Sequence, residues 1–182
     1  MTLKKTVTLK DGRNCLLRNG VTSDGKAVLD VFNRTHEETD YLLTYSDENC
    51  FTASQEADFL QRKTDSTNTV EIIAIVDGVV AGTAGIDALG MRDKIKHRAV
   101  FGIAITKEFW GLDIGKYLME ACIECAREAG YLQLELEVVA ENERAVEMYR
   151  RAGFIEYGRN PKAFRLRTGE YQELIDMRLE LK

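Results

Sequence analysis

The stretch FGIAITKEFWGLDIG, from Phe101 to Gly115, decides the fold of this chain. Its first part, up to Ile105, is apolar and typical of a strand. Its second part is a turn with glycines at 111 and 115 that leads into a helix near Ile114. Glycines let backbone N–H groups crowd together in a turn, and the start of a helix adds unpaired N–H groups and the positive end of its dipole. The stretch predicts a site for a phosphate or diphosphate, although a plain strand–turn–helix connection fits the same pattern.

A second informative stretch follows the predicted helix. Tyr131 to Val139 alternates leucines with carboxylates, as a strand does, and ENERAVEMYRRAGF runs from Glu141 to Phe154. Together the two stretches resemble the GNAT superfamily of acetyl-CoA-dependent N-acetyltransferases. The phosphate loop of that family is written Q/R-x-x-G-x-G/A and is followed by a strand and by N-x-x-A-x-x-x-Y-x-x-x-G-F. This second pattern is filled without a gap by Asn142, Ala145, Tyr149, Gly153 and Phe154.

The other elements can be predicted from local patterns. Asp11-Gly12 lies between two short apolar runs and indicates an opening hairpin. A helical crossover joins the strand that ends at Ile105 to the strand Tyr131–Val139, so these two strands should be parallel. The predicted helices lie near Ala27–Phe32 and Thr52–Leu60 and at Ile114–Ala129 and Glu143–Arg151. The remaining predicted strands lie at Val70–Val76, Val79–Leu89 and Ile95–Ile105 and on both sides of Thr168-Gly169.

We therefore expect a single N-acetyltransferase domain over residues 1–182. Its class is α/β (α+β), and a length of 182 residues suits one core. The resemblance implies a GNAT-like mixed, mostly antiparallel sheet of six to seven strands. It also implies a central parallel pair that splays apart and about four flanking helices.

Composition narrows the classes of partner. The chain is 45% hydrophobic and 30% charged, as folded soluble proteins are, and its net charge of −5 argues against a sequence-independent grip on nucleic acid. The apolar run Ile72–Val76 is too short to span a membrane, and we expect a cytoplasmic protein. Four cysteines and two histidines show no metal-ligand spacing, so we predict buried free thiols and no metal site.

By resemblance, the turn and the strand before it hold acetyl-CoA. Backbone N–H groups of the turn would bind the diphosphate, and the pantetheine arm would pair with the strand, where one N–H would also bond the thioester oxygen. Asn142 would contact the arm or orient the turn, and a role as a helix N-cap is compatible with either. The predicted cofactor-binding residues are Ile103, Ala104, Ile105, Trp110, Gly111, Leu112, Asp113, Ile114, Gly115, Lys116 and Asn142.

Tyr149 stands at the family's general-acid position. Its phenol would give a proton to the departing CoA sulfur, although Tyr149 also belongs to an apolar helical face on which it could simply pack. The strand before the loop has no glutamate where many relatives carry the general base. Glu135, Glu137 and Asp87 are alternatives, as is a chain of water, and the sequence selects none of them. Carboxylates that alternate along a strand more often form a solvated face.

The phosphate loop departs from the family pattern at two positions. Trp110 stands where Gln or Arg is usual, and Asp113 stands where the middle glycine is expected. A carboxylate beside a diphosphate is unfavourable unless it points to solvent, and a residue other than glycine reaches positive φ only with strain. Asp113 could also cap the helix that starts at Ile114 and compete with the anion.

We predict an acetyl-CoA-dependent N-acetyltransferase that moves an acetyl group by direct attack to a primary amine of a small molecule or peptide. The alternative is a non-catalytic CoA-sensing or scaffold protein on the same fold, which Asp113 and the missing glutamate favour. A dinucleotide-binding oxidoreductase fits poorly, because the turn lacks the three-glycine fingerprint. Neither the acceptor nor the oligomeric state, for which a homodimer is open, can be derived from the sequence.

Overall fold

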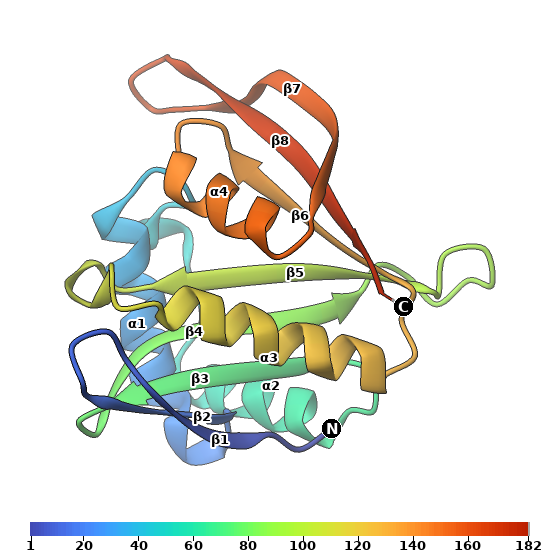
Figure 1. Ribbon diagram of the computed structural model, residues 1–182. Coiled ribbons are helices and arrows are strands. Elements are labelled where there is room, and N and C mark those ends of the chain that lie inside the picture. The colour runs from blue at the N-terminus through green and yellow to red at the C-terminus, as the bar shows by residue number, and fades with distance from the viewer. Residues whose placement is uncertain (182) are drawn as a thin grey trace.

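A computed structural model describes residues 1–181. Its centre is one eight-stranded sheet with the strand order β1-β2-β3-β4-β5-β6-β8-β7 (Figure 1). The strands are β1 (Lys4–Thr8), β2 (Asn14–Asn19), β3 (Val70–Val76), β4 (Val79–Ala88), β5 (Arg98–Ile105), β6 (Gln133–Val139), β7 (Ile155–Arg165) and β8 (Tyr171–Glu180). The helices are α1 (Gly25–Glu38), α2 (Ala53–Asp65), α3 (Ile114–Glu128) and α4 (Glu143–Arg151), with short 3-10 turns at Thr22–Asp24, Ser46–Glu48 and Lys107–Phe109.

The pair β5–β6 is the only parallel pair of this sheet within residues 1–181, and it separates soon after it forms. Its register covers Arg98 with Gln133, Ala99 with Leu134 and Val100 with Glu135, and no later residues pair. Helix α3 makes the crossover between the two strands (Figure 1). Beyond Val100 the two strands form a fork, and the loop that starts α3 lies at the far end of β5.

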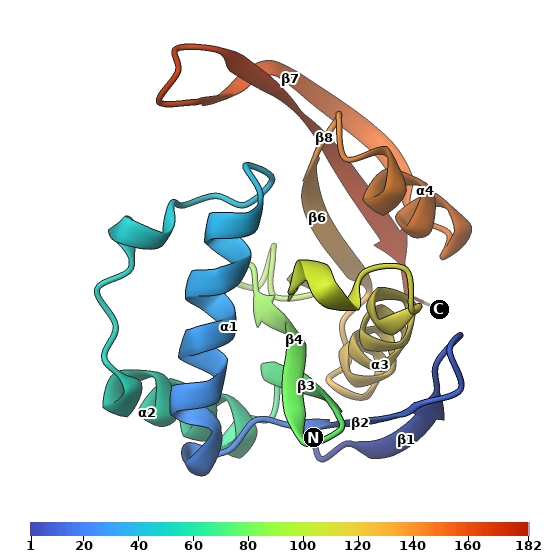
Figure 2. The ribbon, with the colours of Figure 1, turned by 90° about the vertical axis from the view of Figure 1, so that its left-hand side faces the viewer.

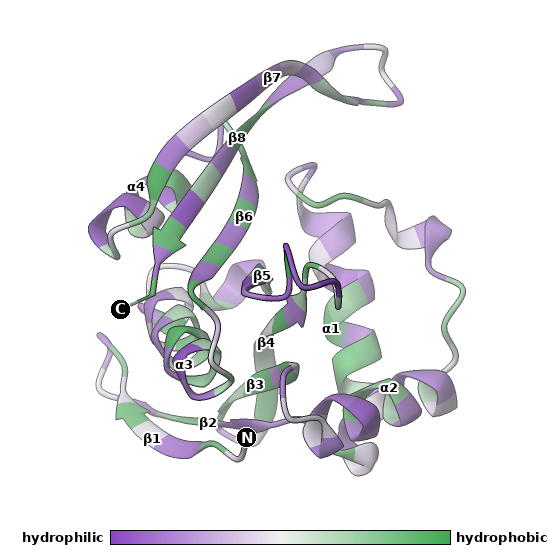
Figure 3. Cartoon of the chain, turned by 90° about the vertical axis from the view of Figure 1, so that its right-hand side faces the viewer, coloured by the Kyte–Doolittle hydropathy of each residue, from purple (hydrophilic) through white to green (hydrophobic). Residues whose placement is uncertain are grey.

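Helices cover the two faces of the sheet. Helices α1 and α2 lie on one face and α3 and α4 on the other, and the β7–β8 hairpin rises above them toward the α1–α2 connection (Figure 2). The main core packs the inner sides of α3 and α4 on the sheet, and a smaller cluster of Val28, Leu60 and Ile73 joins α1 and α2 to β3. Apolar residues accordingly line the inward sides of these helices, with polar residues outward (Figure 3).

The predicted architecture agrees with this fold, including the splayed parallel pair. The sheet has eight strands, one more than the upper end of the expected range, because the first and last hairpins each contribute two full strands. Strand β5 begins at Arg98 rather than Ile95, since residues 92–97 form a turn closed by the bond from Arg98 N to Ile95 O. The helix predicted over Glu143–Arg151 has those bounds in the structure.

Candidate active site

The loop between β5 and α3 presents a row of free backbone donors. Among residues 1–181, the N–H groups of residues 111–116 have no hydrogen-bond partner, whereas Trp110 N bonds Lys107 O and Tyr117 N bonds Asp113 O on either side of the row. Gly111 has a φ of 89°, which a side chain would strain. Six consecutive free donors at the start of a helix form a cradle for an anion with several oxygens.

Asp113 adopts the left-handed conformation that the family pattern assigns to glycine. Its φ is 68°, and Asp is among the few residues besides glycine that tolerate this region. The expectation that it caps α3 is wrong, because its side chain makes no cap hydrogen bond. Oδ1 instead lies 2.9 Å from Nζ of Lys10, on the β1–β2 hairpin, and this ion pair offsets the charge that would repel a phosphate.

Trp110 and Gly115 fix the loop against β5 and α4. The indole Nε1 of Trp110 donates to Ile105 O at 2.7 Å, so this tryptophan ties the loop to the end of the strand. A Cβ on Gly115 would lie 3.2 Å from Sδ of Met148 and 3.3 Å from Cδ1 of Ile105. Glycine at 115 therefore permits close packing of α3 on α4, while Gly111 provides the turn.

Successive residues of β5 direct their backbone N–H and C=O groups alternately to β4 and into the fork. Leu89 N bonds Arg98 O and Thr106 N bonds Ala81 O, so the even-numbered residues of β5 direct their N–H and C=O groups to β4. Ile103 consequently directs its N–H and C=O groups into the fork, where β6 no longer pairs with β5. Ala104, predicted with Ile103 and Ile105 as a backbone contact, instead lies opposite Thr83 and directs its backbone to β4.

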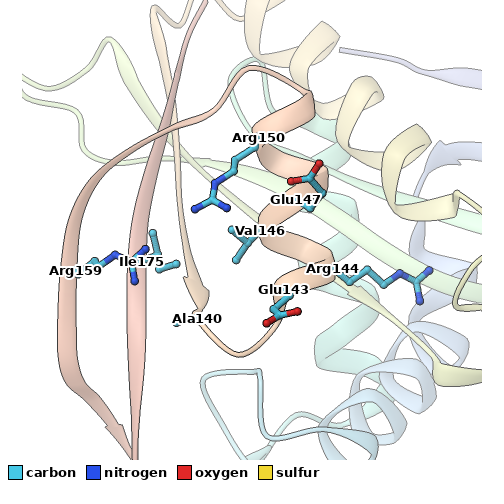
Figure 4. Close-up of a pocket in the computed structure, with 8 residues that line it drawn as sticks. All are labelled: Ala140, Glu143, Arg144, Val146, Glu147, Arg150, Arg159 and Ile175. Carbon is cyan, nitrogen blue, oxygen red and sulfur yellow. The ribbon is translucent and has the colours of Figure 1, made fainter.

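The start of α4 adds an N-cap and a cation. The side chain of Asn142 accepts a bond of 3.3 Å from Ala145 N, so its predicted role as a cap is confirmed. Arg144, which is not a position of the sequence motif, extends from α4 away from Arg159 and Ile175 (Figure 4). A Cβ on Gly111 would lie 3.9 Å from its Nη2, so a cation borders the donor row.

Tyr149 lies in an aromatic cluster on the α3–α4 side of the fork. Its ring is 6.1 Å from that of Phe101, in a T-shaped arrangement, and 5.7 Å from that of Phe154. The residue is 5% exposed. Burial raises the pKa of Tyr149, so the phenol stays protonated at neutral pH and keeps a proton to donate.

The carboxylates that the sequence left open have different surroundings. Glu135 is 7% exposed and not solvated as its alternation suggested, because Arg98 pairs with both of its oxygens, and this bond lowers the pKa of Glu135. Asp87 is paired with Lys63. Glu137 is exposed and faces Asp176 of β8 in the sheet register. Two of the three alternatives are therefore already paired with cations.

Comparison with known proteins decides the family. The sequence profile described as "Acetyltransferase (GNAT) family" matches residues 28–154, which is well over half of the chain. The chain belongs to this family. L-amino acid N-acetyltransferase AaaT of Escherichia coli K12 is 31% identical over 118 residues, which cover 64% of this chain and 72% of that protein.

Solved structures agree with this assignment. An acetyltransferase of the GNAT family from Streptococcus pneumoniae superposes with a TM-score of 0.87 at 27% identity, over 91% of this chain and 99% of that one. The structure of yncA from Salmonella typhimurium with its cofactor acetyl-CoA has a TM-score of 0.82 at 16% identity, covers 93% of this chain and 95% of that one, and supports the fold alone. As a family member, this protein is an acetyl-CoA-dependent acetyltransferase, and the alternative of a non-catalytic sensor gains no support.

Two cavities of this acetyltransferase lie beside the β7–β8 hairpin. One, of about 630 Å³, lies between α4 and the β7–β8 hairpin (Figure 4). Its Arg159 is paired with Glu156 and Glu173, and its Arg150 lies 3.6 Å from Glu156, so both cations already have carboxylate partners. The other, of about 220 Å³, lies between residues 39–48 and 163–166, where the α1–α2 connection meets the hairpin.

Arg167, Asp47 and Tyr45 form a clasp beside this second cavity, where the α1–α2 connection meets the β7–β8 hairpin. Both Nη atoms of Arg167 donate to Asp47, at 2.7 and 2.9 Å, and its guanidinium lies 4.1 Å from the ring centroid of Tyr45. Arg167 N also donates to the hydroxyl of Tyr45 at 3.0 Å. The clasp therefore joins two segments more than a hundred residues apart.

Within residues 1–181 no group of His, Cys, Asp and Glu has the geometry of a metal site, and Cys15, Cys122 and Cys125 are buried free thiols, while Cys50 is exposed. In the same part of the chain, no helix is both long and apolar enough to cross a membrane.

Proposed function

We propose that this acetyltransferase acetylates the primary amine of a small molecule by direct attack, with Tyr149 as its general acid. The observation that carries the proposal is the row of six free N–H groups at residues 111–116, which fits the diphosphate of acetyl-CoA. Arg144 and Lys116 would add positive charge beside these donors, and Lys10 would keep the carboxylate of Asp113 away. Arg144 thereby joins the residues predicted from the sequence.

The strand then positions the reacting group. An arm that starts at the loop and runs back along β5 reaches the fork, where the N–H of Ile103 would bond the thioester oxygen. Acetyl-CoA supplies an activated acetyl group when bound, and the N–H of Ile103 stabilises the negative charge that develops on the oxygen. Tyr149 would give its proton to the sulfur as the C–S bond breaks. Packing of its ring orients the hydroxyl, so a packed Tyr149 can also serve as the general acid.

The acceptor class is inferred from the second cavity and from a relative. A volume of about 220 Å³ beside the clasp suits an amine with a small body. AaaT is by its name an L-amino acid N-acetyltransferase, and we take L-amino acids as the first class to test. We also propose that residues 1–182 act as one domain in the cytoplasm without binding nucleic acid. A homodimer is to be tested by light scattering.

Two measurements on the purified chain test this proposal. Titration calorimetry with acetyl-CoA and with CoA should show binding of both. Thiol release should then depend on the amine in a panel of twenty L-amino acids, polyamines, aminoglycosides and short peptides. Binding without release by any amine would contradict the proposed reaction, and turnover of peptides alone would contradict the small acceptor.

A further inference from the structure

Glu71 of β3 is a carboxylate with no role in the chemistry described so far. It is partly buried on the sheet face that carries Ile73, the face covered by α1 and α2. Lys63 and Glu56 of α2 and Asp87 and Thr83 of β4 are the charged and polar groups that act on it. Lys63 already donates to Asp87 and to Ile86 O, so no cation is dedicated to Glu71.

Two glycines, Gly85 and Gly102, lie between this carboxylate and the fork and place no side chain there. In the sheet register Glu71 lies opposite Gly85, and Gly85 lies opposite Gly102 of β5. Residues opposite one another share a face of the sheet. A Cβ on Gly85 would overlap the Glu71 carboxylate, so that carboxylate lies over Gly85. A Cβ on Gly102 would meet nothing within 4 Å, so the surface there is open.

Gly102 lies where the fork opens. The pairing of β5 with β6 ends at Val100, and the free N–H proposed to bond the thioester belongs to Ile103, the residue after Gly102. Adjacent strands are about 4.8 Å apart, so one strand spacing separates the region over Gly85 from Gly102. A carboxylate over Gly85 is therefore within reach, through one water, of an amine above Gly102.

We propose that Glu71 is the general base of the reaction and takes the proton of the acceptor ammonium through one water. The assignment rests on the proposed transfer to an amine. The lone pair freed on nitrogen forms the new C–N bond to the acetyl carbon as the C–S bond breaks. The first proton released from nitrogen passes to Glu71, and Tyr149 gives its own proton to the sulfur. The second proton, which the nitrogen loses as the amide forms, passes to the tyrosinate of Tyr149 and restores the phenol, so charge and atoms balance.

The surroundings suit this role. Burial raises the pKa of Glu71 to about 7, against the opposing effect of Lys63. A base with a pKa near the working pH is both ionised and basic enough to accept a proton. Glu135, by contrast, has its pKa lowered by Arg98 and is a poor proton acceptor.

The test compares Glu71→Gln with Glu56→Gln, a matched change of a second buried carboxylate in the same cluster. CoA release is followed between pH 5.5 and 9.5 with an amine that the wild type accepts. In the wild type, kcat/KM should rise with pH through about 7 as Glu71 ionises. Glu71→Gln should lower kcat/KM at neutral pH about 100- to 1,000-fold and move that rise to the pKa of the amine itself. Glu56→Gln should keep the rise in kcat/KM but move it slightly to lower pH, because the charge of Glu56 makes a small contribution to the raised pKa of Glu71. Both variants should keep the affinity for acetyl-CoA.

A second readout needs no variant. In the wild type the rise near pH 7 should stay in place across acceptors whose own pKa values differ, because Glu71 and not the amine titrates there. A rise that follows the amine pKa, or one that persists near pH 7 in Glu71→Gln, would overturn the assignment of Glu71 alone. A wild type that turns over no amine would overturn the proposed function, which is a separate result.

Discussion

The two sides of the fork are built from different materials. The proposed cofactor side consists of backbone: free N–H groups at residues 111–116, the inward-facing peptide of Ile103 and a glycine at positive φ. The proposed acceptor side consists of side chains, such as the clasp of Arg167 with Asp47 and the cluster around Glu71. The first can be shared by every member that binds the same cofactor, whereas the second is free to differ with the acceptor.

The largest effect should come from Tyr149, the one side chain that we propose to act on the cofactor side. Tyr149→Phe should lower kcat about 100- to 1,000-fold and leave the affinity for acetyl-CoA unchanged, because only the donated proton is lost. Tyr131→Phe is the matched control: Tyr131 is also 5% exposed, and its hydroxyl donates to Asn68 O at 2.9 Å. The control should cost about 1 kcal/mol of folding free energy and spare kcat. Equal kcat in Tyr149→Phe and the wild type would remove the acid role.

The backbone argument predicts the next largest effect. Gly111→Val forces a β-branched residue to a φ of 89° and should weaken acetyl-CoA binding at least about 100-fold by displacing the donors beside it. Gly169→Val makes the same change at a φ of 95° in the β7–β8 turn, where a Cβ would meet nothing within 4 Å. It should leave the affinity for acetyl-CoA unchanged. Calorimetry on both variants is the measurement, and equal losses would contradict a backbone-built site.

The same contrast explains what the sequence could predict. The turn of residues 111–115 needs glycine for conformational reasons, and α4 needs Asn142 as its cap, so both requirements are visible as residue types at fixed spacing. The strands and helices around the fork could be predicted for a similar reason, since periodicity and turn residues mark them.

Contacts between side chains that are far apart in the sequence have no comparable sequence pattern. Lys10 and Asp113 are 103 positions apart, so the pair that neutralises the loop aspartate depends on the folded hairpin. The proposed role of Glu71 depends on Gly85, which lies opposite it, and on Gly102, which lies opposite Gly85 one strand further on. No spacing rule within one element contains that information, so the general base could not be identified from the sequence alone.

Arg144 tests how much side chains add to the backbone cradle. Arg144→Ala should weaken acetyl-CoA binding about tenfold, with less loss at high salt, because one charge-assisted contact to a phosphate disappears. Arg151→Ala removes a cation from the same helix that pairs instead with Glu147 at 2.8 Å. It should change the affinity less than about twofold. A larger effect for Arg151 than for Arg144 would place the anion elsewhere on α4.

Asp113→Gly should strengthen the cofactor side. The change removes a negative charge from the donor row and places glycine at a φ of 68°, so acetyl-CoA should bind about three- to fivefold tighter without loss of stability. Asp77→Gly is the matched control, since Asp77 has a φ of 50° and pairs with Arg13 at 3.1 Å in the β3–β4 turn. Weaker binding in Asp113→Gly would show that the pair with Lys10 orders the loop and does not merely neutralise it.

The smallest effect should come from the clasp on the acceptor side. Its ion pair is largely exposed, with side-chain exposures of 57% for Arg167 and 64% for Asp47, so water and salt weaken it. Arg167→Ala should change the KM of the acceptor about threefold while leaving the affinity for acetyl-CoA untouched, because the clasp borders only the smaller cavity. Arg159→Ala, on the same hairpin but paired with Glu156 and Glu173, should change neither. A change in acetyl-CoA affinity on loss of the clasp would mean that the two sides of the fork are coupled, and the division between backbone and side-chain construction would then fail as an account of function.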